Sequence, residues 1–480
     1  MLFVASEAYP LIKTGGLADV AGSLPEVLRQ QGADVRLLLP AYHHILESII
    51  RPEPVAELEV AGKHLRIVAT VLPGTEVVTW LVDHPLFSQR PGNPYHNDRG
   101  EPWPDNADRF LLLSRVAALL ATGQGGLDWR PDVLHCNDWH TGPAIALTHL
   151  SEQRPLTVFT VHSLAHMGLF DRATFDRLEL PAHFWHDGAL EYYNQCSFIK
   201  GGLVYADYIT TVSPGYAREI CESPGGMGLE GLLNQRRDRL HGILNGIDNT
   251  VWNPAADKYL TQCYSAESLA DKSVNKLALQ ADLGLCPQAD RPLVGLVGRL
   301  VEQKGLELIL PVLADILATG VQLVILGTGE RRYEQQLRTA AAQNPGEMAV
   351  VLAYDESLAH RIEAAADIFL MPSLFEPCGL NQLYSLRYGT LPLVRAVGGL
   401  ADTVVDANAQ TLADGTATGF VFELPAPGEL LTTLRRAVAL WQDRPRWQQL
   451  QRQAMGRDFS WRHSANRYLQ LYNTPVESRG

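Results

Sequence analysis

Short apolar runs alternate with longer segments of helical periodicity along almost the whole chain. The run Leu2 to Ala5, for example, precedes a helical pattern over Leu17 to Gln31, and the apolar run Val35 to Leu39 follows that pattern. Such alternation is typical of parallel sheets whose strands are joined by crossover helices. Between Val55 and Pro85 strand follows strand, which predicts an antiparallel excursion at a sheet edge. The sequence therefore predicts an α/β fold.

The alternation occurs in two series, which predicts two domains. A chain of 480 residues exceeds the size of one ordinary domain. The turn formers Asn245-Gly246-Ile247-Asp248 separate the two series, and the amphipathic segment Trp461 to Tyr472 is predicted to pack back onto a domain surface. The second series predicts strands over Leu293 to Val297, Gln322 to Leu326, Ala349 to Leu352, Ile368 to Met371 and Pro392 to Val394, and helices over Leu306 to Ala318, Arg331 to Ala342, Leu358 to Ala365 and Leu430 to Trp441.

Charge and cysteine content narrow the class of protein. A formal net charge of -13 without a basic block argues against a nucleic-acid partner and against an anionic membrane surface. The six cysteines are scattered, which favours reduced thiols in a cytoplasmic protein. The first apolar run meets Glu7 too soon for a signal peptide, and charged residues interrupt the longest apolar region, Leu306 to Leu326, so no membrane span is predicted. The histidines and cysteines show no metal-ligand spacing, and no metal is predicted.

A glycine-rich turn lies between the first predicted strand and the first predicted helix. Gly15 and Gly16 would let the backbone approach a ligand closely at a helix N-terminus, and Lys13 adds a charge suited to a phosphate. The alternative interpretation is an ordinary turn with a solvated lysine. A dinucleotide-binding fold would show G-x-G-x-x-G here and an acid after the second strand, where the sequence has Leu39-Pro40-Ala41-Tyr42. A nicotinamide cofactor is therefore disfavoured.

Two strand-to-turn junctions in the second series carry charged residues. Arg299 and Lys304 flank the turn after the first strand, so both cations could neutralise one departing diphosphate unless they are merely solvated. The strand Ile368 to Met371 leads into a proline-broken turn with Glu376 and Cys378. A carboxylate repels phosphate but can accept hydrogen bonds from sugar hydroxyls. Cys378 could be a nucleophile, but no histidine lies beside it in the sequence, and a thiol that lines the site is favoured.

Two strand ends in the first series carry an acid and an imidazole. Asp138 follows the strand Val133 to Cys136, and His162 follows the strand Thr157 to Val161. Because parallel strands end at the same sheet edge, Asp138 and His162 are expected on neighbouring strand tips that face one crevice. A lone histidine at such a position is more often structural.

Taken together, these residues resemble bacterial glycogen synthases and plant starch synthases, the α-1,4-glucan synthases that use ADP-glucose. The matching motifs follow the family's order from end to end: KTGGLADV (Lys13 to Val20), NPYH (Asn93 to His96), NDWHTG (Asn137 to Gly142), SFIKGG (Ser197 to Gly202), NGID (Asn245 to Asp248), GRLVEQKG (Gly298 to Gly305) and PSLFEPCGLNQLYSLRYGTLP (Pro372 to Pro392). The resemblance implies a GT-B fold, with two Rossmann-like domains facing each other across a deep cleft. It divides the chain into an N-terminal domain (1–245), a C-terminal nucleotide-sugar domain (246–455) and a C-terminal helix (456–480) that crosses back to the first domain.

The resemblance also implies roles for individual residues. Those implied for catalysis are Asp138, His162, Arg299, Lys304 and Glu376. Those implied for donor binding are Lys13, Gly15, Gly16, Asp19, Asn245, Arg299, Lys304, Tyr354, Cys378, Gly379, Leu380 and Asn381. Tyr95 and His96 match the acceptor side. Asn381 stands where several relatives have threonine, so we expect altered contacts there.

The implied reaction is retaining transfer of glucose from ADP-glucose to the non-reducing 4-OH of an α-1,4-glucan (glycogen) primer. ADP-glucose is a substrate here, and no cofactor is predicted. One alternative is another GT-B enzyme, such as a UDP-sugar transferase or a nucleotide-sugar epimerase. The other is a glucan-binding protein without catalysis, which the presence of Lys13, Lys304 and Glu376 disfavours. The preference for ADP over UDP rests on the resemblance alone, and no oligomeric state is predicted.

Overall fold

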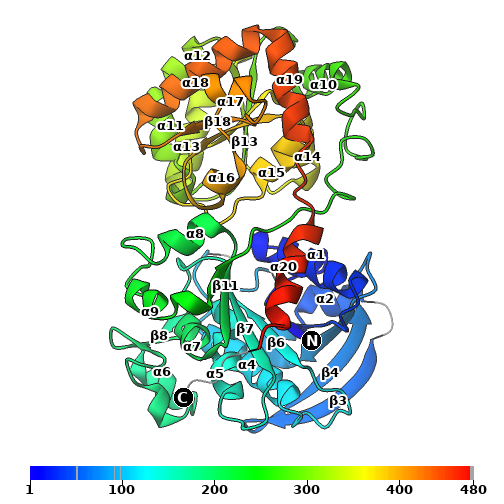
Figure 1. Cartoon of the computed structure of the whole chain (residues 1–480), viewed down its shortest axis with the longest axis vertical. Coiled ribbons are helices and arrows are strands. Elements are labelled where there is room, and N and C mark those ends of the chain that lie inside the picture. Colours follow the sequence, from blue (N-terminus) through cyan, green and yellow to red (C-terminus); the bar gives the residue numbers. More distant parts are fainter. Residues whose placement is uncertain (50–51, 91, 98, 476–480) are drawn as a thin grey trace. The chain divides into compact units, whose positions relative to one another are not determined.

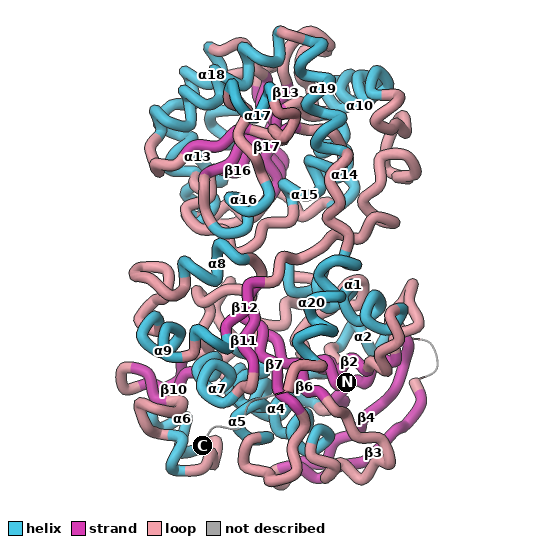
Figure 2. The backbone as a smooth tube through the Cα atoms, in the orientation of Figure 1, coloured by secondary structure: helices cyan, strands magenta, loops and turns pink. Residues whose placement is uncertain are grey.

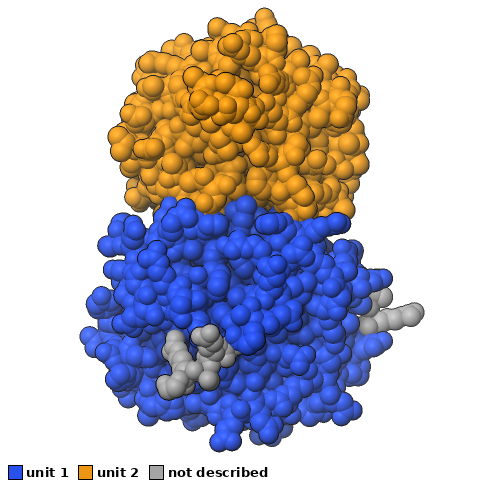
Figure 3. Space-filling view, in the orientation of Figure 1, with its two compact units in different colours: residues 1–246, 461–480 blue, residues 247–460 orange. Residues whose placement is uncertain are grey.

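The computed structural model describes residues 1–49, 52–90, 92–97 and 99–475. The chain divides into two units, which Figure 3 distinguishes by colour: unit 1 comprises Met1–Gly246 and Trp461–Gly480, and unit 2 comprises Ile247–Ser460. The backbone therefore passes from one unit to the other twice. The second passage follows Ser460. Residues 456–460, which we assigned to the C-terminal helix segment, therefore belong to unit 2.

Unit 1 is built on a 9-stranded sheet with the order β12-β11-β7-β6-β1-β2-β5-β4-β3. Its strands are β1 (Leu2–Val4), β2 (Arg36–Pro40), β3 (Glu53–Val60), β4 (Lys63–Val71), β5 (Val78–Asp83), β6 (Val133–Asn137), β7 (Leu156–Val161), β11 (Tyr208–Thr211) and β12 (Leu240–Gly242). β5 pairs in parallel with β2 but antiparallel with β4, and β4 pairs antiparallel with β3. The predicted antiparallel excursion at the sheet edge is confirmed.

The helices of unit 1 include the C-terminal one. They are α1 (Gly16–Gln30), α2 (His43–Ser48), α3 (Pro85–Ser88), α4 (Asn106–Ala121), α5 (Gly142–Thr148), α6 (Arg172–Arg177), α7 (Phe198–Tyr205), α8 (Pro214–Glu219), α9 (Glu230–Gln235) and α20 (Trp461–Tyr472). α20 has the predicted bounds and lies beside α1 (Figure 1). Its apolar face, with Trp461, Ala465 and Tyr468, joins the core of the unit. A small sheet of β8 (Leu169–Phe170), β10 (Gln195–Ser197) and β9 (Glu191–Tyr192) was not predicted.

Unit 2 is built on a 6-stranded parallel sheet with the order β15-β14-β13-β16-β17-β18, and helices flank it (Figure 2). The strands are β13 (Leu293–Val297), β14 (Gln322–Leu326), β15 (Met348–Val351), β16 (Ile368–Met371), β17 (Leu391–Arg395) and β18 (Phe420–Phe422). The helices are α10 (Lys272–Asp282), α11 (Leu306–Ile309), α12 (Leu313–Ala318), α13 (Arg331–Gln343), α14 (Glu356–Ala365), α15 (Asn381–Arg387), α16 (Gly398–Thr403), α17 (Ala409–Ala413), α18 (Pro427–Gln442) and α19 (Arg444–Met455).

One predicted helix of unit 2 is wrong as a single element. The segment 306–318 forms α11 and α12 with a 3-10 turn over Leu310–Val312 between them. Pro311 has no backbone N–H to donate to the preceding turn, and its ring crowds the carbonyl of that turn, so the α-helical hydrogen bonds stop there. No helix among the described residues is long and apolar enough to cross a membrane.

The parallel part of each main sheet contains a point at which the strand order reverses. In unit 1 the chain runs from β1 to β2 on one side and later adds β6, β7, β11 and β12 on the other, so the reversal lies between β1 and β6. In unit 2 it lies between β13 and β16. Open α/β sheets bind ligands beyond the carboxyl ends of the strands at this point, because the flanking loops diverge and leave a crevice.

Candidate active site

The glycine-rich turn of unit 1 lies beyond the carboxyl end of β1. α1 begins at Gly16, and Gly15 precedes it in an extended conformation. The Lys13 Nζ lies 2.7 Å from Asp19 Oδ1, and both side chains are about one-fifth exposed. Glu7 Oε2 accepts a hydrogen bond of 2.6 Å from the backbone N–H of Thr14, which lies in the turn. The Glu7 carboxylate thus holds the backbone of the turn, and the Asp19 carboxylate orients the Lys13 side chain.

Glu7 is a site residue that we did not predict. Its side chain is 3% exposed, and burial raises its pKa to about 7 although two hydrogen bonds from Thr14 act in the opposite direction. A buried acid with a raised pKa at the carboxyl edge of a sheet is a common property of functional sites. The available signal was its position two residues after the first predicted strand, which we used only to exclude a signal peptide.

Replacing Glu7 with glutamine is expected to change how stability depends on pH. The folded-state pKa lies above the ordinary glutamate value, so between about pH 4.5 and 7 the folded wild type binds more protons than the unfolded chain. The wild type should therefore lose stability relative to Glu7→Gln as the pH rises through this range. Denaturant unfolding at a series of pH values measures the difference. Glu57→Gln, at an exposed position on β3, is the control, and parallel curves for wild type and Glu7→Gln would contradict the prediction.

Asp138 and His162 lie together at the carboxyl ends of β6 and β7, as the strand order led us to expect. Asp138 Oδ1 accepts a hydrogen bond of 2.7 Å from the backbone N–H of His162. Burial raises the pKa of Asp138 to about 7 and lowers that of His162 to about 3, so the imidazole is neutral at pH 7. His162 Nε2 lies 3.0 Å from the amide oxygen of Asn137, whose nitrogen donates to the Val4 carbonyl. The imidazole proton therefore resides on Nε2.

The backbone of Asp138 is strained. Its φ of 56° and ψ of -179° fall in a region that glycine occupies almost alone. The conformation costs on the order of 1–3 kcal/mol and persists only where the surroundings impose it. Strain of this kind gathers at active sites, and here it turns the Asp138 carboxylate towards the tip of the neighbouring strand.

The predicted acceptor-side residues differ in exposure. The Tyr95 hydroxyl lies 2.7 Å from Ser6 Oγ, and the Tyr95 ring is 4.7 Å from that of His140, whereas His96 is exposed. Tyr95 is thereby joined to the segment between β1 and the glycine-rich turn. Asn245 is buried beyond the edge strand β12, and its Oδ1 has no hydrogen-bond partner among the described residues. Unit 1 does not bring Asn245 to the reversal point.

In unit 2, Lys304 from the turn after β13 and Glu376 from the turn after β16 form an ion pair. Lys304 Nζ donates a hydrogen bond of 2.6 Å to Glu376 Oε2, which also accepts one of 2.9 Å from the Ser373 hydroxyl. Lys304 follows β13 and Glu376 follows β16, so the pair spans the reversal point. Arg299, on the same turn as Lys304, is exposed. Lys304, which we assigned to the donor diphosphate, and Glu376, which we assigned to the sugar, are thus in direct contact.

Glycines allow the turns that carry Lys304 and Glu376 to pack closely against each other and against the segment after β17. Gly305, next to Lys304, has a φ of +74°, and a Cβ there would come within 2.0 Å of the Pro372 carbonyl oxygen. Gly398 has a φ of +42°, and its Cβ would lie 2.0 Å from the Glu376 carbonyl oxygen, which accepts a hydrogen bond from the Gly399 N–H. We did not predict the role of Gly398 and Gly399, although a glycine pair between a strand and a helix was a visible signal.

The other predicted donor residues of unit 2 lie in two places. Cys378 is buried, and Gly379 and Leu380 precede α15. Asn381 begins α15 and donates a hydrogen bond of 2.7 Å to the carbonyl of Val297, the last residue of β13. Tyr354 is 69% exposed beyond β15, the edge strand. Asn381 therefore joins the reversal point, and Tyr354 lies two strands away from β13.

Comparisons with known proteins agree on one family. Residues 1–235 match the family model described as starch synthase catalytic domain, and residues 287–454 match the one described as glycosyl transferases group 1. The chain is 53% identical over 472 residues to glycogen synthase 1 of Methylococcus capsulatus, covering 98% of this chain and 96% of the relative. It is 52% identical over 474 residues to glycogen synthase of Cellvibrio japonicus, covering 98% of each. The chain belongs to the glycogen synthase family.

Solved structures place this glycogen synthase family member in the GT-B fold, as predicted. The catalytic domain of starch synthase IV from Arabidopsis thaliana superimposes with a TM-score of 0.87 at 31% identity, covering 98% of both chains. Sucrose-phosphate synthase from Thermosynechococcus elongatus, at 17% identity and a TM-score of 0.59, shares the fold. The chain is thus a glycosyltransferase, and its two units are the two Rossmann-like domains of that fold.

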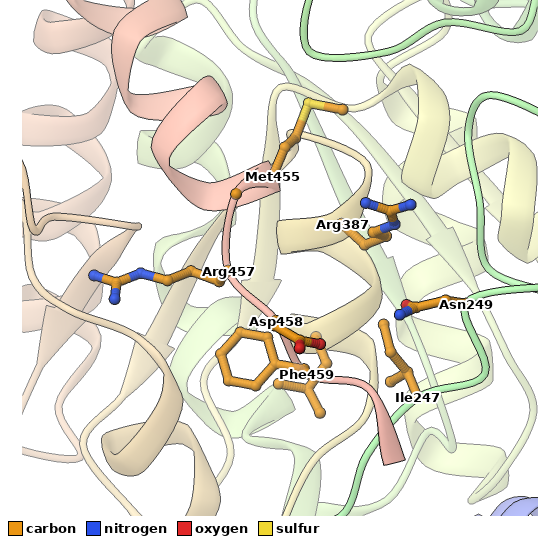
Figure 4. Close-up of a pocket in the computed structure, with 9 residues that line it drawn as sticks. Ile247, Asn249, Arg387, Met455, Arg457, Asp458 and Phe459 are labelled. Atoms are coloured by element: carbon orange, nitrogen blue, oxygen red, sulfur yellow. The ribbon is translucent and has the colours of Figure 1, made fainter. Parts of the chain in front are cut away.

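A pocket of about 200 Å³ in unit 2 of this glycosyltransferase is lined by none of the predicted site residues, and Figure 4 shows the residues that do line it. Ile247 and Asn249 line it from the segment that enters unit 2, and Met455 to Phe459 line it from the segment that leaves. Leu383 and Arg387 of α15 complete the wall. α15 therefore begins at Asn381 near the reversal point and ends in this pocket.

Proposed function

We propose that this protein elongates glycogen by transferring glucose from ADP-glucose to the non-reducing 4-OH of an α-1,4-glucan, with retention of configuration. The Lys304–Glu376 pair at the reversal point of unit 2 carries the proposal. An ammonium group beside a carboxylate suits a donor in which an anionic diphosphate is directly attached to a neutral, hydroxyl-rich sugar. The starch synthase IV structure contains bound ADP and acarbose, which supports an adenine nucleotide and a glucan as ligands here.

In the proposed reaction the bond between the anomeric carbon and the diphosphate oxygen breaks, and a bond to the acceptor 4-oxygen forms. Lys304 and Arg299 of unit 2, with Lys13 of unit 1, neutralise the charge that develops on departing ADP. We assign no residue as a covalent nucleophile. The acceptor attacks the face from which ADP leaves, and an oxygen of the departing phosphate takes the acceptor's proton. The proposal requires no cofactor.

The carboxylates have a different task in this mechanism. Glu376 accepts hydrogen bonds from the glucosyl hydroxyls, since its second oxygen, Oε1, is not the one that Lys304 and Ser373 contact. Asp138 and the neutral His162 hold the glucosyl ring as positive charge develops on it. The unit 1 turn at Gly15 and Gly16 lets backbone N–H groups approach the donor phosphates.

The decisive test supplies glycogen primer with ADP-glucose or with UDP-glucose, each labelled in the glucose, and measures nucleotide release and labelled polymer. We expect primer-dependent ADP release with matching incorporation of label. Polymer formed equally well from UDP-glucose would overturn the assigned donor. Primer binding without release of either nucleotide would favour a glucan-binding protein instead. We further propose a cytoplasmic location, which the scattered spacing of the six cysteines favours.

A further inference from the structure

A buried arginine holds the segment that carries Tyr95 and His96. The Arg109 side chain, on α4, is 0% exposed. Its Nη1 donates hydrogen bonds to the Pro94 carbonyl at 2.6 Å and to Asn106 Oδ1 at 3.0 Å, and its Nε donates to the Leu86 carbonyl at 3.0 Å. One planar guanidinium thus joins α4 to the short helix α3 and to the segment that carries Tyr95 and His96.

Burying this cation is costly, because none of these hydrogen-bond acceptors is a carboxylate. Arg109 Nη2 has no hydrogen-bond partner among the described residues. The rings of Tyr42, Phe87 and Phe110 lie 5.5 to 5.9 Å from the guanidinium carbon and offset part of the cost. An apolar side chain would fill this space at lower cost, so the hydrogen bonds to the loop are the feature that the arginine adds.

The segment held in this way continues into the candidate site. Asn106 uses its amide nitrogen to donate a hydrogen bond of 2.9 Å to the Tyr95 carbonyl. The Tyr95 hydroxyl reaches Ser6, whose carbonyl oxygen accepts a hydrogen bond of 2.9 Å from the Tyr42 hydroxyl. Ser6 directly precedes Glu7, which supports the glycine-rich turn. His96 and Asn93 are the exposed residues of this segment. The Tyr95 hydroxyl is bonded to Ser6, and Asn93 Oδ1 accepts hydrogen bonds from the backbone N–H groups of Tyr95 and His96, so the His96 side chain is the better candidate for contact with a ligand.

We infer that Arg109, with Asn106, is a positioning residue that fixes the segment 93–96 so that His96 can contact the glucan acceptor. The inference rests on the proposed function and on the acceptor-side match of His96 that the resemblance implies. One hydrogen bond from Arg109, to the Pro94 carbonyl, and one from Asn106, to the Tyr95 carbonyl, hold the backbone of this segment at two successive residues. A lysine at this position could not reach the Leu86 and Pro94 carbonyls with the same geometry, since its ammonium group is a single point on a flexible chain.

The test is a kinetic comparison of Arg109→Lys with the wild type. We expect the KM for glycogen primer to rise about tenfold or more, as the loss of a charged hydrogen bond typically causes. The KM for ADP-glucose, measured at saturating primer, should rise much less, because Arg109 and Asn106 bond the segment 93–96 directly and reach the glycine-rich turn only through Tyr95, Ser6 and Glu7. Asn106→Ala should change the primer KM in the same direction. The double variant should show less than the product of the two single effects, since both residues act through one segment.

Arg115→Lys is the matched control. Arg115 lies on the same helix, and its Nη2 donates a hydrogen bond of 2.6 Å to the Leu178 carbonyl, away from the segment 93–96. Thermal unfolding of both lysine variants separates a loss of stability from a loss of positioning. An unchanged primer KM in folded Arg109→Lys, or equal increases in the two KM values, would overturn the inference. If Arg109→Lys does not fold, the same criteria apply to Asn106→Ala.

The design also separates this inference from the proposed function. Failure of the wild type to make polymer from ADP-glucose would overturn the proposed donor without bearing on Arg109. In that case, calorimetric titration with a linear maltooligosaccharide would compare acceptor binding directly. Weaker binding by Arg109→Lys than by Arg115→Lys would support the inference, and equal binding would overturn it.

Discussion

Replacing Lys304 with alanine is expected to lower kcat by about two to three orders of magnitude. An effect of this size is seen when one preorganised hydrogen-bond donor to a developing negative charge is removed. The ammonium group lies 2.6 Å from Glu376 Oε2 and is about one-quarter exposed. Its removal takes a cation from the departing diphosphate and leaves the buried Glu376 carboxylate with the Ser373 hydroxyl. Steady-state turnover at saturating ADP-glucose and glycogen measures the effect, and thermal unfolding shows whether the variant is folded.

Two further variants sharpen this prediction. Lys258→Ala removes an exposed lysine elsewhere in unit 2 and should leave kcat near the wild-type value. Glu376→Gln keeps the shape of the side chain but removes its charge, and we expect a large loss of kcat. The Lys304→Ala, Glu376→Gln double variant should lose much less than the product of the single effects, because the two groups act as a pair. A folded Lys304→Ala that keeps kcat within tenfold of the wild type would contradict the assignment.

The parallel strands were the most predictable part of the fold. β13, β14 and β16 have the predicted bounds, because a strand that is buried on both faces reads as a short apolar run between turn formers. The β8-β10-β9 sheet was missed, since strands such as Leu169–Phe170 and Glu191–Tyr192 are too short to show a period. α19 was also missed. It buries Trp447 and Leu450, but most of its other positions are polar, and its apolar signal is weak.

The site could be predicted as a set of strand ends but not as a set of contacts. Parallel strands share an edge, so Asp138 with His162, and Lys304 with Glu376, could be assigned to common places. The Lys304–Glu376 ion pair joins residues far apart in the sequence, and it depends on side-chain directions that no spacing encodes. The role of Gly398 likewise depends on its distance to the Glu376 carbonyl oxygen. Close packing between loops is a tertiary property, and it becomes visible only in the folded structure.

Asp138→Asn is expected to lower kcat by about two orders of magnitude or more while the fold persists. The amide oxygen can still accept the hydrogen bond from the His162 N–H, so the strained turn can keep its shape. The variant loses the negative charge that the proposed mechanism places near the developing positive charge on the glucosyl ring. The measurement is turnover at saturating substrates at about pH 8, above the raised pKa of the wild-type carboxyl, where that group is ionised.

Asp138→Asn, which is expected to lower kcat, should at the same time raise the free energy of unfolding relative to the wild type. The folded-state pKa of Asp138 is about 7, above the ordinary value of 3.8. Between these values the folded wild type holds a proton that the unfolded chain has lost, so wild-type stability falls as the pH rises from about 4 to 7. Asp138→Asn has no such group, and its stability relative to the wild type should increase over this range. Asp138 would then be retained at a cost in stability for the sake of catalysis. A variant that is both fully active and no more stable at pH 8 would contradict both the assigned role and its physical cause.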